Sequence, residues 1–147
     1  MTIKQTALGI ALGAMIAHPS LAETPLSLSI NGVTGLIDMP SADQQSDGTL
    51  SLTRSNFGPT GRTTLSFQIT PRLSGSFRYS SIKHWGSSTA ASTLYDRSFD
   101  LRYKLITEGR YLPALTIGMQ DFIGTGVFSG EYIVATKSLG PKLKVTA

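Results

Sequence analysis

Alternation of apolar and polar residues recurs along most of this sequence after residue 48, and no other feature constrains the fold as strongly. It is clearest in residues 97–106, where two sets of side chains alternate without a break: Phe99, Leu101, Tyr103 and Leu105 against Ser98, Asp100, Arg102 and Lys104. Successive side chains of a strand point to opposite faces of a sheet, so a period of two predicts strands. The other such stretches are residues 49–57, 63–70, 73–80, 114–122, 131–137 and 142–147. We therefore predict an all-β fold, an antiparallel up-and-down meander of about seven strands.

Two kinds of connection alternate between the predicted strands. Residues 70–72 and 107–113 are short and carry Pro or Gly, whereas residues 83–96 form a longer polar stretch and residues 124–130 a Gly-rich one. Short turns at one end and longer loops at the other are typical of outer-membrane β-barrels. No apolar run is long enough for a transmembrane helix, so a membrane protein of this sequence would have to cross with strands.

Alternation alone does not distinguish a membrane barrel from a soluble periplasmic β-sandwich that binds a sugar or a protein partner. In the sandwich, Phe67, Phe77, Leu101 and Ile117 would form the core, and Trp85 with Tyr95 would form a platform on a loop. Three features favour the barrel: a predicted signal peptide at the N-terminus, the alternation of short and long connections, and the aromatic residues near strand ends. Those aromatic residues are Trp85, Tyr95, Phe99, Tyr103, Tyr111, Phe122 and Tyr132.

The first 22 residues are predicted to be a secretory signal peptide. Lys4 supplies a positive charge, and residues 6–17 form a short apolar run. Ser20 and Ala22 are the small residues that signal peptidase requires at the third and first positions before the cleavage site at Glu23. No cysteine follows the apolar run, so we expect no lipid anchor. Export without disulfide bonds fits a Gram-negative envelope, and we expect the mature chain in the outer membrane.

Charge and reactive residues exclude several classes of function. The net charge is +4 without a run of Lys or Arg, so nucleic-acid binding is not expected. His84 is the single histidine after residue 22, no G-x-S-x-G motif accompanies it, and the chain has no cysteine. A Ser-His-Asp triad and an ordinary zinc site are therefore not supported. We expect no enzymatic activity, no cofactor and no metal.

The stretch of residues 121–137 packs three glycines, Gly124, Gly126 and Gly130, between two apolar runs. A phosphate-binding glycine loop requires a helix to begin at the glycines. Here β-branched and aromatic residues follow Gly130, and the spacing is G-x-G-x-x-x-G. The stretch therefore predicts a loop between two strands, in which the glycines permit positive φ angles.

Charged residues fall on the polar faces of the predicted strands. Asp100 and Asp121 are a candidate carboxylate pair for glycoside hydrolysis, but no other catalytic feature accompanies them. We favour charges that face the interior of a barrel and pair across strands. This set comprises Arg78, Asp100, Arg102, Lys104 and Asp121.

Three stretches resemble the N-terminal part of the YjbH-like family of Gram-negative outer-membrane proteins, which are associated with exopolysaccharide or capsule production. They are residues 31–52, 98–105 and 108–137, and the most specific element reads D-x-x-G-T-G-x-F-x-G-E-Y. The resemblance implies an outer-membrane barrel with outer-membrane lipid, exopolysaccharide and other polysaccharide-secretion proteins as partners. It gives the motif an architectural role and carries over no catalytic residue. The motif positions are Asp121, Gly124, Thr125, Gly126, Phe128, Gly130, Glu131 and Tyr132.

Length is where this sequence departs from the family, whose members run to several hundred residues. Bacterial single-chain barrels have an even number of at least about eight strands, because every strand edge must be paired in lipid. About seven strands are predicted here. We therefore expect residues 23–147 to be the N-terminal part of a YjbH-like barrel, truncated and unable to close by itself.

Overall fold

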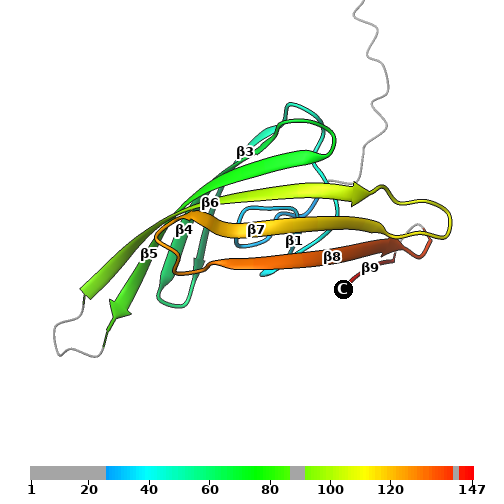
Figure 1. The fold of residues 1–147 in the computed structure, drawn as a ribbon. Helices are drawn as coiled ribbons and strands as arrows, with labels where there is room; N and C mark the ends of the chain where they lie inside the picture. Colours follow the sequence, from blue (N-terminus) through cyan, green and yellow to red (C-terminus); the bar gives the residue numbers. More distant parts are fainter. Residues whose placement is uncertain (1–25, 87–91, 141–142) are drawn as a thin grey trace, which may run out of the picture.

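The computed structural model describes residues 26–86, 92–140 and 143–147, and their regular structure is all β (Figure 1). Seven strands form one sheet in sequence order, each antiparallel to its neighbour, and the sheet curls into a half-barrel. The strands are β3 (Leu50–Phe57), β4 (Thr60–Gln68), β5 (Leu73–Trp85), β6 (Ser92–Ile106), β7 (Ala114–Gly124), β8 (Gly130–Ser138) and β9 (Lys144–Thr146). The predicted seven-stranded meander is confirmed. Among the described residues, no helix has the length and apolarity that crossing a bilayer requires.

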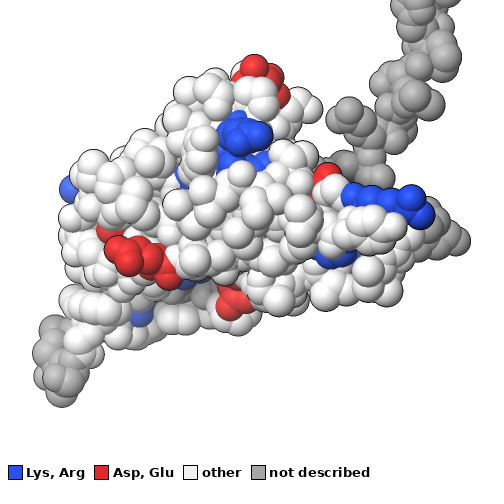
Figure 2. Space-filling view, turned by 45° about the vertical axis from the view of Figure 1, so that its right-hand side comes forward, with Lys and Arg blue, Asp and Glu red and all other residues white. Residues whose placement is uncertain are grey.

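The two faces of the sheet have the reverse of the usual burial pattern. The concave face, which we call the polar face, is buried although it carries mainly Ser, Thr, Arg and Asp. The convex face, which we call the apolar face, is exposed: Leu52 is 72% exposed, Ile133 70% and Phe77 45%. Most of the surface visible in Figure 2 is uncharged, and the charges lie in a few separate groups. A water-soluble sheet would bury its apolar face instead.

The connection between β5 and β6 is shorter than predicted. We expected a loop over residues 83–96, but β5 continues to Trp85 and β6 begins at Ser92. Tyr79 pairs with Arg97, and the ladder continues to Lys83 and Thr93. The prediction was wrong because the alternation changes face here: Ile82 and Leu94 point to the polar face, whereas Lys83 and Thr93 lie on the outer side.

A segment that the sequence did not predict to be ordered lies against the polar face. Residues 27–45, here called the inner segment, contain a small hairpin of β1 (Gly35–Leu36) and β2 (Met39–Pro40). In Figure 1 it lies inside the curve of the sheet, behind β7 and β8. Hydrogen bonds join it to β5, β6, β7 and β8. The predicted signal peptide, residues 1–22, lies outside the described residues.

Glu108 joins two connections at the other end of the sheet from the Gly-rich loop. Its Oε1 accepts hydrogen bonds from the backbone N of Ser138 at 2.8 Å and from Nζ of Lys137 at 3.1 Å. The Ser138 amide, more than the Lys137 ammonium, lowers the pKa of Glu108 below its ordinary value of 4.5. The contact ties the β6–β7 connection to the end of β8.

The lowered pKa of Glu108 predicts a pH-dependent contribution to stability. A carboxylate with a depressed folded-state pKa stabilises the fold above its unfolded-state pKa, and this contribution is lost as the pH falls through the folded-state pKa. We expect Glu108→Gln to lower the free energy of unfolding by about 0.5 kcal/mol at pH 7 and to have no effect near pH 2. Urea unfolding at both pH values measures this, with Asp47→Asn, in an exposed connection, as the charge-matched control. An equal difference at both pH values would contradict the prediction.

Candidate functional site

Arg102 attaches the inner segment to the sheet. Its side chain is buried on the polar face of β6, with 3% of the residue exposed. Nη1 donates a hydrogen bond to Oγ1 of Thr34 at 2.6 Å, and Nη2 donates to the carbonyl oxygen of Ser41. These two acceptors lie on either side of the β1–β2 hairpin, so one guanidinium holds both arms of it. The planar fork of arginine suits this two-point attachment.

Ala42 forms the second attachment of the inner segment, through its backbone. Its N donates to Oγ1 of Thr136 at 2.8 Å, and its carbonyl oxygen accepts from Oγ1 of Thr116 at 3.2 Å. Ala42 is fully buried, and it packs with Ala114 and Val134 in the small apolar cluster of the described residues. The two threonines thus satisfy a backbone position that has no ladder partner.

Asp100 is the centre of a second polar cluster, one inward-facing position along β6 from Arg102. Its Oδ1 accepts from Nη2 of Arg78 at 3.2 Å and from the backbone N of Asp121 at 2.8 Å, and its Oδ2 accepts from Oγ of Ser76 at 3.0 Å. Nε of Arg78 donates to Oγ of Ser98 at 3.1 Å. Arg78 is completely buried, so Asp100 supplies the counter-charge that this guanidinium requires.

The Gly-rich loop, residues 125–129, is fixed to the end of the sheet by the same cluster. Oδ2 of Asp121 accepts from the backbone N of Phe128 at 3.1 Å, and Oγ1 of Thr125 donates to Oδ1 of Asp96. At Gly124 the φ angle is +152°, and an added Cβ would lie 2.0 Å from the carbonyl oxygen of Arg97. No other residue fits at that position without displacing the backbone of β6.

The structure brings most of the predicted inward-facing charges together on one face of the sheet. Four of the predicted inward-facing charges are buried on the polar face, Arg78, Asp100, Arg102 and Asp121, while Lys104 is half-buried there without a side-chain hydrogen bond among the described residues. Asp100 and Asp121 do meet, but through the backbone N of Asp121; both oxygens of Asp100 accept hydrogen bonds, whereas Asp121 uses its Oδ2 alone and its buried Oδ1 has no partner among the described residues. Nothing in this arrangement aims the two carboxyl groups at a common substrate atom.

The last residues of the glycine motif belong to β8, where their side chains point to opposite faces of the sheet. Gly130 begins this strand, Glu131 is exposed on the apolar face, and Tyr132 points to the polar face. The ring of Tyr132 covers Gly118, where an added Cβ would lie only 2.2 Å from it. The motif therefore contributes separate structural contacts to the loop and to β8.

Three features of the polar face were missed by the sequence analysis. The first is the inner segment, and the other two are Arg62 and Asp96 on the polar face near the Gly-rich loop. The guanidinium of Arg62 lies 5.0 Å from the ring centroid of Phe128, and Oδ1 of Asp96 holds Thr125. Thr34, Ser41 and Ala42 belong to the stretch 31–52 that carries the family resemblance, and this is the signal that pointed to them.

Comparison with known proteins assigns the family. A family described as exopolysaccharide biosynthesis protein YbjH matches residues 27–147. The chain belongs to the YjbH family. It is 35% identical over 115 residues to the "Uncharacterized lipoprotein YjbH" of Escherichia coli (strain K12). That match covers 75% of this chain and 16% of the relative, so the chain spans about a sixth of that relative's length. No solved structure matches.

The YjbH match extends over the whole described structure, including the inner segment. Its boundaries, residues 27–147, start where the inner segment starts and include all seven strands of the sheet. The resemblance stated from the sequence is confirmed. The half-barrel and its inner segment are therefore features of the region that identifies the YjbH family.

Proposed function

We propose that this chain forms part of an outer-membrane β-barrel that serves the production or export of an exopolysaccharide in a Gram-negative bacterium. One observation carries the proposal, namely the exposed apolar face and the buried polar face of the curled sheet. In a bilayer the outer face of a barrel meets hydrocarbon chains, and the interior is polar. The family description, exopolysaccharide biosynthesis, supplies the process.

The apolar face is too extensive for an ordinary soluble monomer. It continues over all the long strands and includes Leu50, Leu65, Phe77, Tyr103, Ile117, Met119 and Ile133, each between 37% and 70% exposed. Soluble monomers rarely expose contiguous apolar patches larger than a few hundred Å². Between β6, β7 and β8 the face has a shallow hollow of about 460 Å³ lined mainly by Leu101, Tyr103, Ile117, Met119 and Ile133, with Glu131 at its long-loop end. Its shape and lining suit acyl chains.

The alternative, a soluble periplasmic β-sandwich, lacks a core here. Its proposed core residues Phe67, Phe77, Leu101 and Ile117 all lie on the apolar face. The buried apolar side chains among the described residues are small or few: Ala42, Ile82, Ala114 and Val134. They bury too little apolar surface to hold two sheets together in water.

The role that we propose for the polar face is passive contact with a polar polymer. Arg78, Arg102 and Lys104 would favour an acidic glycan, and Asp100 with Asp121 would moderate their field. Several buried polar atoms have no protein partner among the described residues, including Nη1 of Arg78, Oγ of Ser80 and Oδ2 of Asp96. These atoms have less than 1 Å² of accessible surface each, so small buried water molecules are the partners that fit them, and the glycan meets the field of the charges and not these atoms. We propose no catalysed reaction, and polysaccharide-secretion proteins are the proposed protein partners.

Subcellular fractionation tests the location and separates the two functions. We expect the chain, expressed in a Gram-negative host as part of the complete barrel, in detergent-extracted outer membrane and not in osmotic-shock fluid. A strain lacking the gene should release less exopolysaccharide into the medium. The name of the Escherichia coli relative, a lipoprotein, agrees with an envelope location. Recovery of a folded, soluble monomer in the shock fluid would overturn the proposal.

A charged substitution on the apolar face gives a more specific test of membrane insertion. Ile133 is 70% exposed in the middle of β8, so Ile133→Arg would be nearly neutral in a soluble protein. In a bilayer the same change should cost about 2–4 kcal/mol and reduce the amount of membrane-inserted protein. Leu139→Arg, in the connection after β8, is the matched control and should have little effect. Equal behaviour of the two variants would count against membrane insertion.

A further inference from the structure

We infer that the apolar face carries a binding site for the phosphate groups of anionic membrane lipids, formed by Arg54, Tyr79 and Arg97. The inference rests on the proposed membrane location and adds a lipid class to it. These residues lie in one row across four neighbouring strands. Arg54 pairs with Thr63, Thr63 pairs with Tyr79, and Tyr79 pairs with Arg97. Three strand spacings place the Cα atoms of the two arginines about 14 Å apart.

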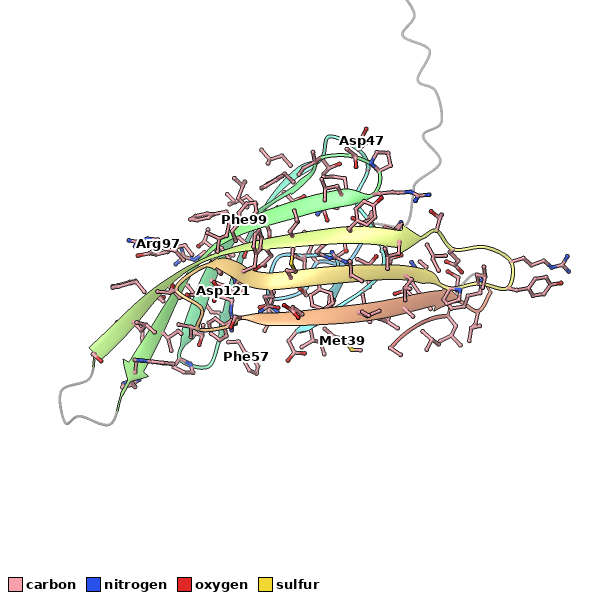
Figure 3. All side chains as sticks on the ribbon, in the orientation of Figure 1. Met39, Asp47, Phe57, Arg97, Phe99 and Asp121 are labelled. Atoms are coloured by element: carbon pink, nitrogen blue, oxygen red, sulfur yellow. The ribbon has the colours of Figure 1, made fainter. Side chains whose placement is uncertain are left out.

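Aromatic contacts hold Arg97 at this position. Its guanidinium carbon lies 5.8 Å from the ring centroid of Tyr79, which stacks on Tyr95 with a centroid distance of 5.9 Å. Figure 3 shows Arg97 and Phe99 projecting from the outer side of the sheet. A guanidinium held on an aromatic ring loses less freedom on binding, and its planar fork matches the geometry of phosphate oxygens.

The row marks the level where the apolar face ends. The next row toward the short turns is apolar and consists of Leu52, Leu65, Phe77 and Phe99. The next row toward the long loops contains Asn56, Gly61, Ser81 and Tyr95. From Arg97 to Leu105 the strand covers about 27 Å, or about 20 Å after tilting, close to the height of an outer-membrane apolar band. The arginines are therefore at the depth of lipid phosphates.

The charges around the row are complementary to an anion. The outer side of β3 to β6 carries the cations Arg54, Lys83 and Arg97, all exposed. The carboxylates of these strands, Asp96 and Asp100, are buried on the opposite face. In the part of the chain that the structure describes, the ion pairs are Arg78–Asp100, Lys137–Glu108 and Lys144–Asp43. None of them neutralises a cation of the row.

Vesicle flotation tests the inference with the full chain. One set of vesicles contains phosphatidylcholine alone, and the other contains equal amounts of phosphatidylcholine and phosphatidylglycerol. We expect the double variant Arg54→Gln, Arg97→Gln to bind the anionic vesicles about thirtyfold more weakly than the wild type. Its binding to phosphatidylcholine should be unchanged. The charge-matched control is Arg72→Gln, Arg110→Gln, at the exposed short-turn end, for which we expect a change below threefold.

Three other outcomes overturn the inference, and they differ in what they say about the membrane location. If the wild type and the double variant bind both kinds of vesicle equally, the phosphate site is wrong while membrane binding stands. If the control variant loses as much binding to the anionic vesicles as the Arg54, Arg97 variant, the lipid is attracted by the overall positive charge, and the row does not form a specific phosphate site. If the wild type binds neither kind of vesicle, the membrane location fails as well.

Discussion

Replacement of Asp100 by alanine should lower the free energy of unfolding by about 3–5 kcal/mol. Asp100 accepts hydrogen bonds from Arg78, from Ser76 and from the backbone of Asp121. Its loss leaves the guanidinium of Arg78, which has no exposed surface, with the hydroxyl of Ser98 as its remaining acceptor. An uncompensated buried charge is among the most destabilising changes that a single substitution makes.

A double variant distinguishes a buried ion pair from charges in a hydrated interior. When both members of a buried pair are replaced by neutral side chains, most of the cost disappears. Asp100→Ala combined with Arg78→Met should therefore be more stable than Asp100→Ala alone. Asp47→Ala, in an exposed connection, serves as the control and should change stability by less than about 0.5 kcal/mol. Urea unfolding in detergent micelles measures all of these variants.

The stability of Asp100→Ala would also show whether water reaches the charges of the polar face. If Asp100→Ala costs less than about 1 kcal/mol, water reaches Arg78 and solvates it, as at a surface pair. The charges that were predicted to pair across strands would then lie in a hydrated interior and not in a packed cluster. The buried pair would also be contradicted if the double variant lost as much free energy of unfolding as the two single variants lose together, because the two side chains would then act independently.

The strands were predictable because a membrane barrel and a soluble sheet share the period of two. The sequence of β6 places Phe99, Leu101 and Tyr103 on one face and Asp100 with Arg102 on the other, in any sheet. Whether the apolar side of a strand points inward or outward is not a property of that strand alone. It emerges from the curvature of the whole sheet and from the inner segment, which covers the polar face. This is why the sequence left the sandwich open and the structure disfavours it.

The limits of the sequence analysis follow from long-range contacts. Arg102 lies 68 residues after Thr34 along the chain, and no local pattern pairs the two. The end of β5 and the start of β6 were missed because Ile82 and Leu94 fall on the polar face there, so the alternation of each strand does not continue in phase. The Gly-rich loop was predicted because glycines between two strand patterns give a local signal.

The three stretches of family resemblance meet in space at β6. Arg102, from residues 98–105, binds Thr34 and Ser41, from residues 31–52. Asp100, one inward-facing position away, binds the backbone of Asp121, from residues 108–137. Adjacent inward positions of one strand therefore connect the inner segment to the Gly-rich loop. A structural core built from polar contacts therefore explains why the three stretches of family resemblance occur together.

Replacement of Arg102 by methionine should release the inner segment from the sheet. The guanidinium makes two hydrogen bonds to it, and each bond to a charged donor contributes about 1.5–3 kcal/mol. Methionine keeps much of the volume and makes neither bond, so the carbonyl oxygen of Ser41 loses its donor and the hydroxyl of Thr34 keeps only its bond to the carbonyl oxygen of Asp43. The loss of about 3 kcal/mol raises the population of the released state by about a hundredfold.

A single engineered cysteine reports this release, because the chain contains no cysteine. Ser41 is 6% exposed, and Ser41→Cys changes its size little, so a maleimide should label Cys at this position slowly in the wild-type background. We expect labelling about a hundredfold faster when Arg102→Met is added. Lys104→Met is the matched control, because Lys104 follows Arg102 on the same face of β6 and its side chain makes no hydrogen bond in the described part of the chain. Unchanged labelling with Arg102→Met, or an equal increase with Lys104→Met, would show that Arg102 does not hold the inner segment in place.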